Sequence, residues 1–364
     1  MRGREGDGHA APRYPAAVAS DPPLRLNLDG AALTRNWRWF ADRSGAAACG
    51  AAVKADAYGL GAAEVVPRLA AAGCLDFFVT TWEEARALAG ACAGLSLSVL
   101  HGVRGADMAE ASASAARPVL NSPAMVARWK KAAPGRPCDV MVDTGMNRLG
   151  LTLAEATSGL LDGLVIETLM SHLACADEPE HPLNETQRAR FAALTVAVPA
   201  RRYSLANSAG ICLGAGYTYD LTRPGLGLYG GVPGPAATGH IAAVARIEAQ
   251  VLQVRDVAAG ESVGYGATFV TDRSTRVAIL NIGYADGYFR LLGPSGAALA
   301  GTTRCPVLGR VSMDLLAVDV TSADVTEGDW LSIERDLPAA AAASGLSQYE
   351  LLTGLGHRYQ RRWT

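Results

Sequence analysis

The chain has 364 residues, which is long for a single hydrophobic core, so its length predicts two domains. Hydrophobic residues make up 49% and charged residues 19%, a balance that excludes a largely disordered chain. The formal net charge is -2, from 33 basic and 35 acidic residues without a long run of one sign. A nucleic-acid partner is therefore not expected.

The sequence shows no sign of export, membrane insertion or a disulfide frame. No segment reaches 18 uninterrupted apolar residues, so no membrane span is predicted. Residues 1–23 are rich in Gly, Ala, Pro and charge, and we interpret them as a flexible tail rather than a signal peptide. Seven scattered cysteines without a C-x-x-C pair indicate reduced thiols and no metal site. A cytoplasmic protein is expected.

From Leu24 onward, short apolar runs alternate with Ala-rich helical stretches. Eight such units indicate an α/β fold with an eight-stranded (β/α)8 barrel of the TIM type over residues 24–235. A doubly wound open sheet is the competing architecture, because a count of short strands is good to about one or two. The predicted strands cover residues 47–53, 76–80, 96–100, 117–120, 138–142, 164–171, 202–206 and 218–222, with helical stretches such as 81–89, 122–133 and 183–198.

A Gly/Pro cluster at residues 231–235 marks a candidate domain boundary. The runs beyond it are short, β-branched and separated by Gly or Asp turns, and they cover residues 251–254, 276–282, 315–320 and 329–333. This texture predicts a C-terminal domain of mostly antiparallel β-structure over residues 236–364. A helical period returns in residues 347–358.

One lysine stands out at the end of the first predicted strand. The residues from Ala46 to Val53 are small and apolar without alternation, as in a strand buried on both faces, so Lys54 sits at a carboxyl end. A lysine that snorkels to the rim is the simpler interpretation. However, Tyr58 and two glycines follow within seven positions, beside an amine that burial could keep partly neutral and nucleophilic. This neighbourhood predicts a Schiff-base site.

Barrel enzymes carry their functional groups at the carboxyl ends of the strands. Candidates stand at five of the eight predicted ends, in chain order Lys54, Arg148, His172, Asn207 with Ser208, and Arg223 with Gly225. The loops after the last two strands often hold a phosphate in such barrels. The sequence therefore predicts a phosphate site near Asn207, Ser208 and Gly225.

Seven separated motifs run from about Leu24 to Tyr359 in a fixed order. They are Val53-Lys54-Ala55-Asp56-Ala57-Tyr58-Gly59, Asp143-Thr144-Gly145-Met146-Asn147-Arg148-Leu149-Gly150, Ser171-His172-Leu173-Ala174, Ala206-Asn207-Ser208-Ala209, Arg223-Pro224-Gly225-Leu226-Gly227-Leu228-Tyr229-Gly230, Gly264-Tyr265-Gly266 and Gly309-Arg310-Val311-Ser312-Met313-Asp314. This set resembles the alanine racemases, pyridoxal phosphate (PLP) enzymes of fold type III. The usual sequence of that family has Asn in place of Asp56.

The resemblance implies PLP bound to Lys54 and two catalytic bases, Lys54 and Tyr265. The implied cofactor contacts are Lys54, Tyr58, Arg148, His172, Asn207, Ser208, Arg223, Gly225, Leu226 and Tyr349, and the implied substrate contacts are Arg148, Tyr284 and Met313. Without the resemblance, Arg148 would be a surface arginine, His172 a core histidine and Tyr265 an ordinary turn aromatic.

The resemblance also implies a head-to-tail homodimer, in which Tyr265, Tyr284 and Met313 complete the partner's active site. Lys54 would act on the D-enantiomer of alanine and Tyr265 on the L-enantiomer. An unperturbed phenol has a pKa near 10, so proton removal by Tyr265 needs help from nearby positive charge or an acceptor, which we expect from His172 or Arg148.

Arg223 is the most informative residue of the set. The resemblance places it at the pyridine nitrogen, where many PLP enzymes have a carboxylate that keeps the nitrogen protonated. A guanidinium keeps its own proton and can only donate to an unprotonated nitrogen. The ring is then a weaker electron sink, which favours racemisation over transamination.

The expected function is interconversion of L- and D-alanine for the peptidoglycan precursor pool. A racemase of another amino acid or a broader set is the nearest alternative, since the motifs define the cofactor site better than the side-chain pocket. A non-catalytic PLP-binding regulator would lack the second domain. A decarboxylase of the same two-domain architecture is disfavoured by Arg223.

Met141 departs from the family pattern. Many members have a lysine at this place that carries a carbamate and orients the arginine of the following loop. A thioether can neither be carbamylated nor balance a guanidinium. We therefore expect Arg148 to be held by another group, such as a bound anion or a nearby side chain.

Overall fold

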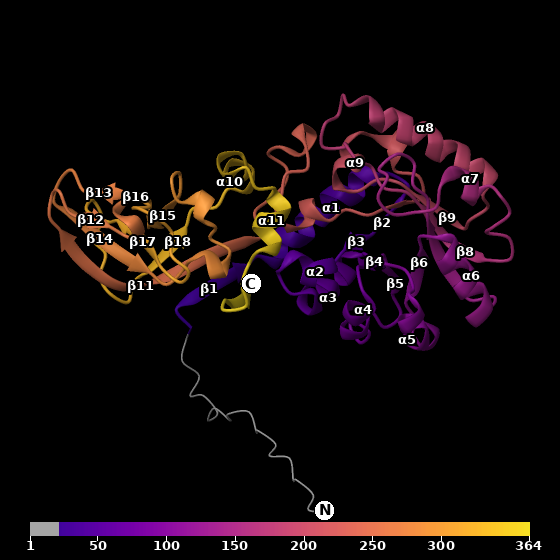
Figure 1. Cartoon of the computed structure of the whole chain (residues 1–364), viewed down its shortest axis with the longest axis horizontal. Helices are drawn as coiled ribbons and strands as arrows, with labels where there is room; N and C mark the ends of the chain where they lie inside the picture. The colour runs from indigo at the N-terminus through magenta and orange to yellow at the C-terminus, as the bar shows by residue number, and fades with distance from the viewer. Residues whose placement is uncertain (1–21) are drawn as a thin grey trace, which may run out of the picture.

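The computed structural model describes residues 22–364 and consists of two bodies, each built on a β-sheet (Figure 1). The expected flexible tail, residues 1–23, therefore lies almost entirely outside the described residues. The body on the right of Figure 1 contains the parallel strands, and the body on the left contains most of the antiparallel ones.

Seven parallel strands form one sheet in sequence order, from β3 to β9. They are β3 (Ala51–Ala52), β4 (Asp76–Val79), β5 (Ser96–Val99), β6 (Arg117–Leu120), β7 (Pro137–Met141), β8 (Val165–Met170) and β9 (Arg202–Ser204). All four residues of β4 are buried, as expected for a strand covered on both faces. The apolar runs of the sequence thus correctly predict these strands.

The parallel sheet agrees only in part with the expected closed barrel. The strands β2 (Ala48–Cys49) and β10 (Leu221–Thr222) form a separate parallel pair, so the continuous sheet has seven strands rather than the expected eight. Backbone hydrogen bonds nevertheless join this pair to both edges, from Ala52 N to Pro224 O and from Arg223 N to Ala206 O, both 2.9 Å.

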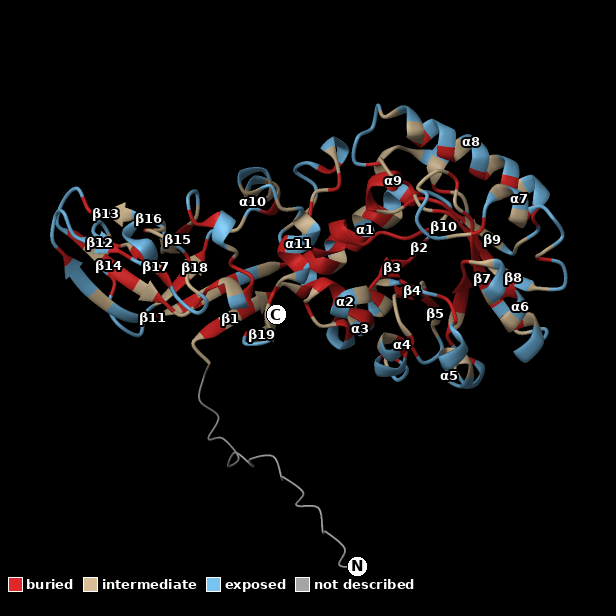
Figure 2. Cartoon of the chain, in the orientation of Figure 1, coloured by how far each residue is buried: buried red, intermediate tan, exposed pale blue. Residues whose placement is uncertain are grey.

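Helices connect successive parallel strands and bury one face against them (Figure 2). They are α3 (Ala62–Ala72), α4 (Trp82–Ala87), α5 (Met108–Ala113), α6 (Pro123–Ala132), α7 (Leu153–Ala156), α8 (Pro182–Ala197) and α9 (Ser208–Cys212), preceded by α1 (Gly30–Ser44) and the short α2 (Lys54–Tyr58). Capping residues explain where some of these helices begin. Asp29 caps α1 by accepting from Ala32 N, and Ser122 caps α6, whose first residue is Pro123.

The second sheet has eight strands and is mostly antiparallel, as the sequence predicts. It contains β1 (Leu24–Leu28), β11 (Ala245–Val257), β14 (Thr275–Leu280), β15 (Ala297–Ala300), β16 (Thr303–Pro306), β17 (Leu316–Asp319), β18 (Trp330–Ile333) and β19 (Gln360–Trp363), while β12 (Ser262–Val263) and β13 (Phe269–Val270) form a small hairpin.

The first strand lies in this second sheet, although the sequence analysis assigns residues 24–235 to the barrel. Leu26 pairs with Ile247 of β11 in antiparallel register and with Arg361 of β19 in parallel register. A five-residue alternating strand has no local feature that selects its partner, so the assignment of 24–28 to the barrel is wrong at the level of sheet pairing.

The C-terminal segment returns from the second sheet to the parallel one. It contains α10 (Leu337–Ser344) and α11 (Gln348–Thr353), and α11 lies between the two bodies in Figure 1. The Gln348 side chain exchanges hydrogen bonds with the backbone of Val232, at 2.8 and 2.9 Å. Arg361 donates to the carbonyl of Gly59 at 2.9 Å, just after α2.

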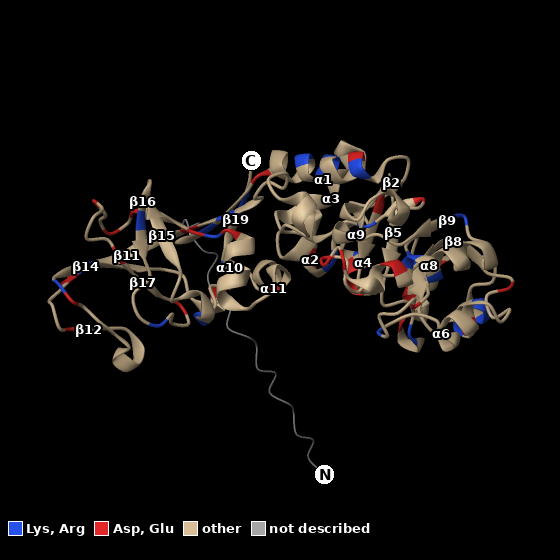
Figure 3. Cartoon of the chain, turned by 90° about the horizontal axis from the view of Figure 1, so that it is seen from above, with Lys and Arg blue, Asp and Glu red and all other residues tan. Residues whose placement is uncertain are grey.

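Within the part of the chain that the structure describes, no helix is long and apolar enough to cross a membrane. Basic and acidic residues are interspersed over both bodies (Figure 3).

The pairing of β1 predicts a stability effect. Leu26 is fully buried in the core, so Leu26→Ala should lower the free energy of unfolding by about 2–5 kcal/mol, because it leaves a cavity. Denaturant unfolding of the two variants measures this. Leu252→Ala is the matched control: its side chain on β11 is 39% exposed, and the change should cost less than about 1 kcal/mol. Equal effects would contradict the pairing.

Candidate active site

A cavity of about 620 Å³ opens where the parallel strands end. Ten residues that the sequence analysis selects line this cavity together: Lys54, Tyr58, Arg148, His172, Asn207, Ser208, Arg223, Gly225, Leu226 and Tyr349. They come from strand ends and loops spread over the whole parallel sheet, and from helix α11 of the C-terminal segment. The expected convergence at the carboxyl ends is therefore found.

Lys54 follows β3 directly, and its ammonium is a costly group at this position. Burial lowers the pKa of Lys54, and the positive charges of Arg148 and Arg223 lower it further, while Glu84 opposes them. A larger fraction of the amine is therefore neutral than for a lysine in water. A neutral amine is the form that attacks a carbonyl carbon.

The turn after Lys54 is left-handed. Residues 55–58 all have φ between 52° and 57°, a region that costs non-glycine residues about 1–2 kcal/mol each. Glu84 holds this turn: one carboxylate oxygen accepts from Ala55 N at 2.7 Å, and the other accepts from Thr80 N at 2.6 Å. Sequence reasoning missed Glu84, although the pattern Thr81-x-x-Glu84 is a recognisable capping box.

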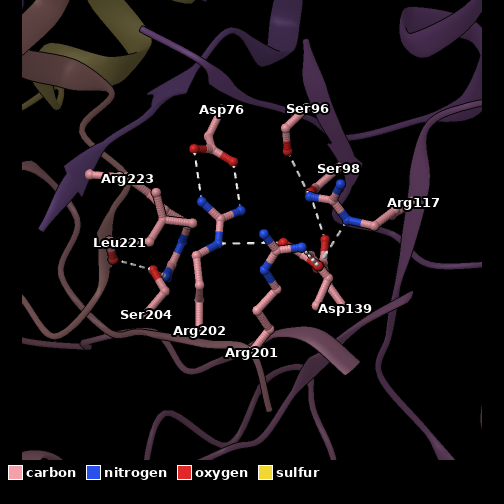
Figure 4. Close-up of polar contacts among 12 residues, drawn as sticks. Asp76, Ser96, Ser98, Arg117, Asp139, Arg201, Arg202, Ser204, Leu221 and Arg223 are labelled. Carbon is pink, nitrogen blue, oxygen red and sulfur yellow. Dashed lines mark hydrogen bonds and ion pairs between the residues drawn. The ribbon is translucent and has the colours of Figure 1, made fainter. Parts of the chain in front are cut away.

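Arg223 is buried beneath the cavity and held by neutral groups (Figure 4). Its guanidinium donates to the carbonyl of Ser171 at 2.6 Å and to the hydroxyl of Ser204, which itself donates to Leu221 O at 2.5 Å. Burial lowers the pKa of Arg223 to about 10, partly offset by the charge of Asp139. Arg223 therefore stays protonated at neutral pH and acts only as a donor.

A layer of charged residues lies beside Arg223 (Figure 4). Asp139 is fully buried on β7, accepts from Ser98 at 2.6 Å and pairs with Arg117 at 3.3 Å. Next to it, Arg202 binds Asp76 through two hydrogen bonds of 2.7 and 3.0 Å. Sequence reasoning missed this layer, because the two members of each pair lie on different strands and neither one indicates its partner in the sequence.

His172 is kept neutral by its surroundings. Burial, and then the positive charges of Arg223, Lys54 and Arg148, lower its pKa to about 3. The expectation that His172 supplies positive charge to a phenol is therefore wrong, whereas help from an acceptor or from Arg148 stays a prediction. Gln187 of α8 fixes the His172 backbone by donating to its carbonyl at 2.9 Å.

The loop that carries Arg148 is organised by Asp143. Its carboxylate accepts from Gly145 N at 2.7 Å and from Arg148 N at 2.9 Å. Met141 is buried at the end of β7 and lines the same cavity. Among the described residues, no hydrogen bond or ion pair holds the Arg148 guanidinium. The expectation that a group other than residue 141 orients Arg148 therefore stays a prediction.

The opposite end of the cavity suits a phosphate. The Ser208 hydroxyl accepts from Gly225 N at 2.8 Å and from Gly227 N at 3.3 Å, so its own proton is free to face the cavity. A side chain at Gly225 would collide with the Tyr58 hydroxyl, which therefore requires glycine there. Tyr58 stacks on Tyr229 with ring centroids 4.7 Å apart. Asn207 caps α9 by accepting from Gly210 N.

Three expected site residues do not line this cavity. Tyr265 is 66% exposed and lies between β12 and β13, at the end of the second body far from α2 (Figure 1). Tyr284 and Met313 lie on adjoining loops, where Ala285 N donates to Met313 O at 3.0 Å, and Met313 is 53% exposed. One chain therefore does not bring Tyr265 to Lys54.

The fold and the cavity together define a two-domain enzyme of the class that anchors PLP through a lysine. A family model described as "Alanine racemase, N-terminal domain" matches residues 28–233, and one described as "Alanine racemase, C-terminal domain" matches residues 244–363. The chain belongs to the alanine racemase family.

Individual relatives agree along nearly the whole chain. The alanine racemase of Acidiphilium cryptum is 43% identical over 348 residues, 92% of this chain and 97% of that protein. The crystal structure of alanine racemase from Bartonella henselae with covalently bound pyridoxal phosphate superposes with a TM-score of 0.89 at 34% identity, covering 94% of this chain and all of that one. The biosynthetic alanine racemase from Pseudomonas aeruginosa gives 0.86 at 33% identity, with 94% and 100% covered.

The environment of His172 predicts an unusual titration. Its folded pKa of about 3 lies below the ordinary value of about 6.5, so between these values the unfolded chain binds a proton that the folded chain does not. His172 should therefore stay neutral from about pH 7 to about pH 5 and make the fold less stable as the pH falls. Imidazole NMR titration measures this, with His172→Gln assigning the signal. A midpoint near the ordinary value would contradict the prediction.

Proposed function

We propose that this protein interconverts L- and D-alanine, with PLP held by Lys54. The observation that carries the proposal is the meeting of Lys54, Arg223 and Ser208 in one cavity: an amine of lowered pKa, a buried donor and a hydroxyl beside free space. When bound, PLP supplies an electron-withdrawing ring that makes the α-proton of alanine removable.

The residues that line the cavity have different proposed roles, which follow from their positions. Ser208, Gly225, Leu226, Tyr58, Asn207 and Tyr349 surround the place for the cofactor phosphate. With PLP bound, Arg223 would donate to the ring nitrogen and would leave it unprotonated, which makes the ring a weaker electron sink. His172 stays neutral beside it and adds no charge. The amine of Lys54 removes or returns the α-proton on one face of the substrate.

We propose that the second base, Tyr265, comes from a partner subunit. Racemisation needs a second base on the opposite face, and Tyr265 does not line the cavity of Lys54 within one chain. Large side chains are exposed on three connecting segments of the second body, at Tyr265, at Leu291, and at Met313 with Leu315. In a head-to-tail homodimer, this surface covers the partner's cavity, and Tyr284 and Met313 reach the substrate carboxylate with Arg148.

We also propose that β2 and β10 complete an eight-stranded barrel. The hydrogen bonds on both sides of Leu221–Thr222 support closure. Because β1 belongs to the second sheet, we propose that the barrel domain covers residues 29–235 and the C-terminal domain covers residues 236–364. A cytoplasmic location and supply of D-alanine for peptidoglycan complete the proposal.

A racemase of other amino acids would use the same residues. Only the fit of the substrate side chain in its pocket distinguishes such an enzyme from an alanine racemase. A decarboxylase would release CO2 from L-alanine, whereas a racemase lowers its optical rotation without gas release. A non-catalytic PLP-binding regulator would do neither. Following optical rotation and CO2 on pure protein therefore separates the three alternatives.

Lys54 should be the only lysine that binds the cofactor covalently. The wild-type protein should be yellow, and borohydride should bleach the visible band and fix the cofactor to the peptide that contains residue 54. Lys54→Ala should lose the band, because the amine is gone. Lys130→Ala is the control: its amine donates to Leu160 O on the outside of the barrel, and the variant should stay yellow. A reducible band in Lys54→Ala would refute the assignment.

Subunit mixing tests the shared site. Lys54→Ala and Tyr265→Ala should each be inactive, but a mixed dimer carries one site with both bases and one with neither. Equal mixing with subunit exchange should restore roughly a quarter of wild-type activity, measured by optical rotation. Tyr265→Ala should still bind PLP, as its absorbance will report. If heterodimers form by mass measurement and activity does not return, the two bases belong to one chain.

A further inference from the structure

The second body contains a cavity that the proposed reaction does not use. Its volume is about 290 Å³, and it lies between the second sheet and the helices α10 and α11. Its walls are mainly apolar, from Ile247, Leu292, Ile333, Ala340 and Leu351. This size is near the lower end of small-molecule sites, so an occupant must be small.

One polar group in this cavity is a phenol without a partner. Tyr288 is only 5% exposed, and its hydroxyl is buried without a hydrogen bond to any described residue. Burial, and then the charge of Glu334, raise the pKa of Tyr288, so the hydroxyl is a neutral donor. Any side chain at Gly296 would collide with this hydroxyl. An unsatisfied buried donor is costly unless a ligand supplies an acceptor.

The second polar group is a guanidinium without a counter-charge. Arg335 lines the cavity, is half-buried and donates to the carbonyl of Leu351. Two acids, Glu334 and Asp336, also line the cavity, but each has another partner. Glu334 pairs with Arg304 at 2.9 Å, and Asp336 caps α10 by accepting from Ala339 N at 2.8 Å. Burial lowers the pKa of Arg335, and no carboxylate of the described chain forms an ion pair with it. A buried cation of this kind attracts an anion.

We propose that this cavity is a binding site for a small monocarboxylate with a branched or aromatic apolar body. The carboxylate accepts from the Tyr288 hydroxyl and from the Arg335 guanidinium, and the apolar body packs against the walls. A phosphate or other compact anion fits less well, because it would leave the apolar walls without contact.

The site adjoins two of the segments that carry proposed active-site tyrosines. Arg335 binds the backbone of α11, and α11 carries Tyr349 into the cofactor cavity. Tyr288 follows the short 3-10 helix η6 (Tyr284–Asp286), whose first residue is Tyr284. An occupant therefore contacts the supports of Tyr349 and of Tyr284, which the proposed function assigns to the cofactor and to the substrate.

Calorimetric titration of the PLP-loaded protein with phenylacetate tests the site. Phenylacetate should bind saturably, and its uncharged analogue phenylacetamide should bind about tenfold more weakly or worse, because it lacks the charge that Arg335 requires. Tyr288→Phe should weaken phenylacetate about tenfold, the loss expected for one hydrogen bond to a charged group. Ala340→Leu should abolish binding by filling the cavity.

Ala342→Leu is the matched control, because it adds the same side chain to α10 at an exposed position that does not line the cavity. It should bind phenylacetate like the wild type. Equal affinity of Ala340→Leu and Ala342→Leu, or unchanged affinity of Tyr288→Phe, overturns the proposal. Displacement of phenylacetate by alanine also overturns it, since the probe would then occupy the cofactor cavity. None of these outcomes depends on whether the racemase proposal holds.

Discussion

Three cationic side chains, Lys54, Arg148 and Arg223, share one cavity, and the rest of the site depends on how their charge is tolerated. Desolvation lowers the pKa values of Lys54, Arg223 and His172, and repulsion by the neighbouring cations lowers those of Lys54 and His172 further, which keeps His172 neutral. The charge of Arg223 is stabilised by fixed dipoles and by the more distant carboxylate of Asp139, and not by an acid in contact with it. The Ser171 carbonyl and the Ser204 hydroxyl bind Arg223 directly. As a result, the site has a donor that cannot give up its proton beside an amine that can.

The same site depends on both bodies of one chain. The C-terminal segment crosses from the second sheet, places Tyr349 at the cavity and ties β19 to the turn after Lys54 through Arg361 and the Gly59 carbonyl. That turn is left-handed and strained, so it needs support from outside, which Glu84 and Arg361 provide. While the C-terminal segment closes the site of its own chain, the loops of Tyr265 and Met313 point to the surface at the other end. This division explains why a single chain does not bring Tyr265 to the cavity of Lys54.

Much of the fold could be predicted from local pattern. The apolar runs gave the parallel strands within a few residues, because strands buried on both faces must be continuously apolar. The position of β1 could not be predicted, because five residues that alternate between buried and half-buried fit the edge of either sheet. The left-handed turn at residues 55–58 was equally hidden, since alanine and tyrosine do not favour it, and only the surrounding contacts stabilise it.

The sequence by itself determined the chemical types of the site: an amine at a strand end, an arginine where an acid is common, and a glycine-rich phosphate loop. Only the tertiary structure decided the charge states, since a pKa depends on burial and on charges from distant segments, as for His172. It also decided which residues meet. Asp139 and Arg117 form an ion pair between two strands, and Tyr288 and Arg335 line one cavity, although the members of each set are separated along the chain. Such neighbours have no sequence signal, because they meet only in the folded chain.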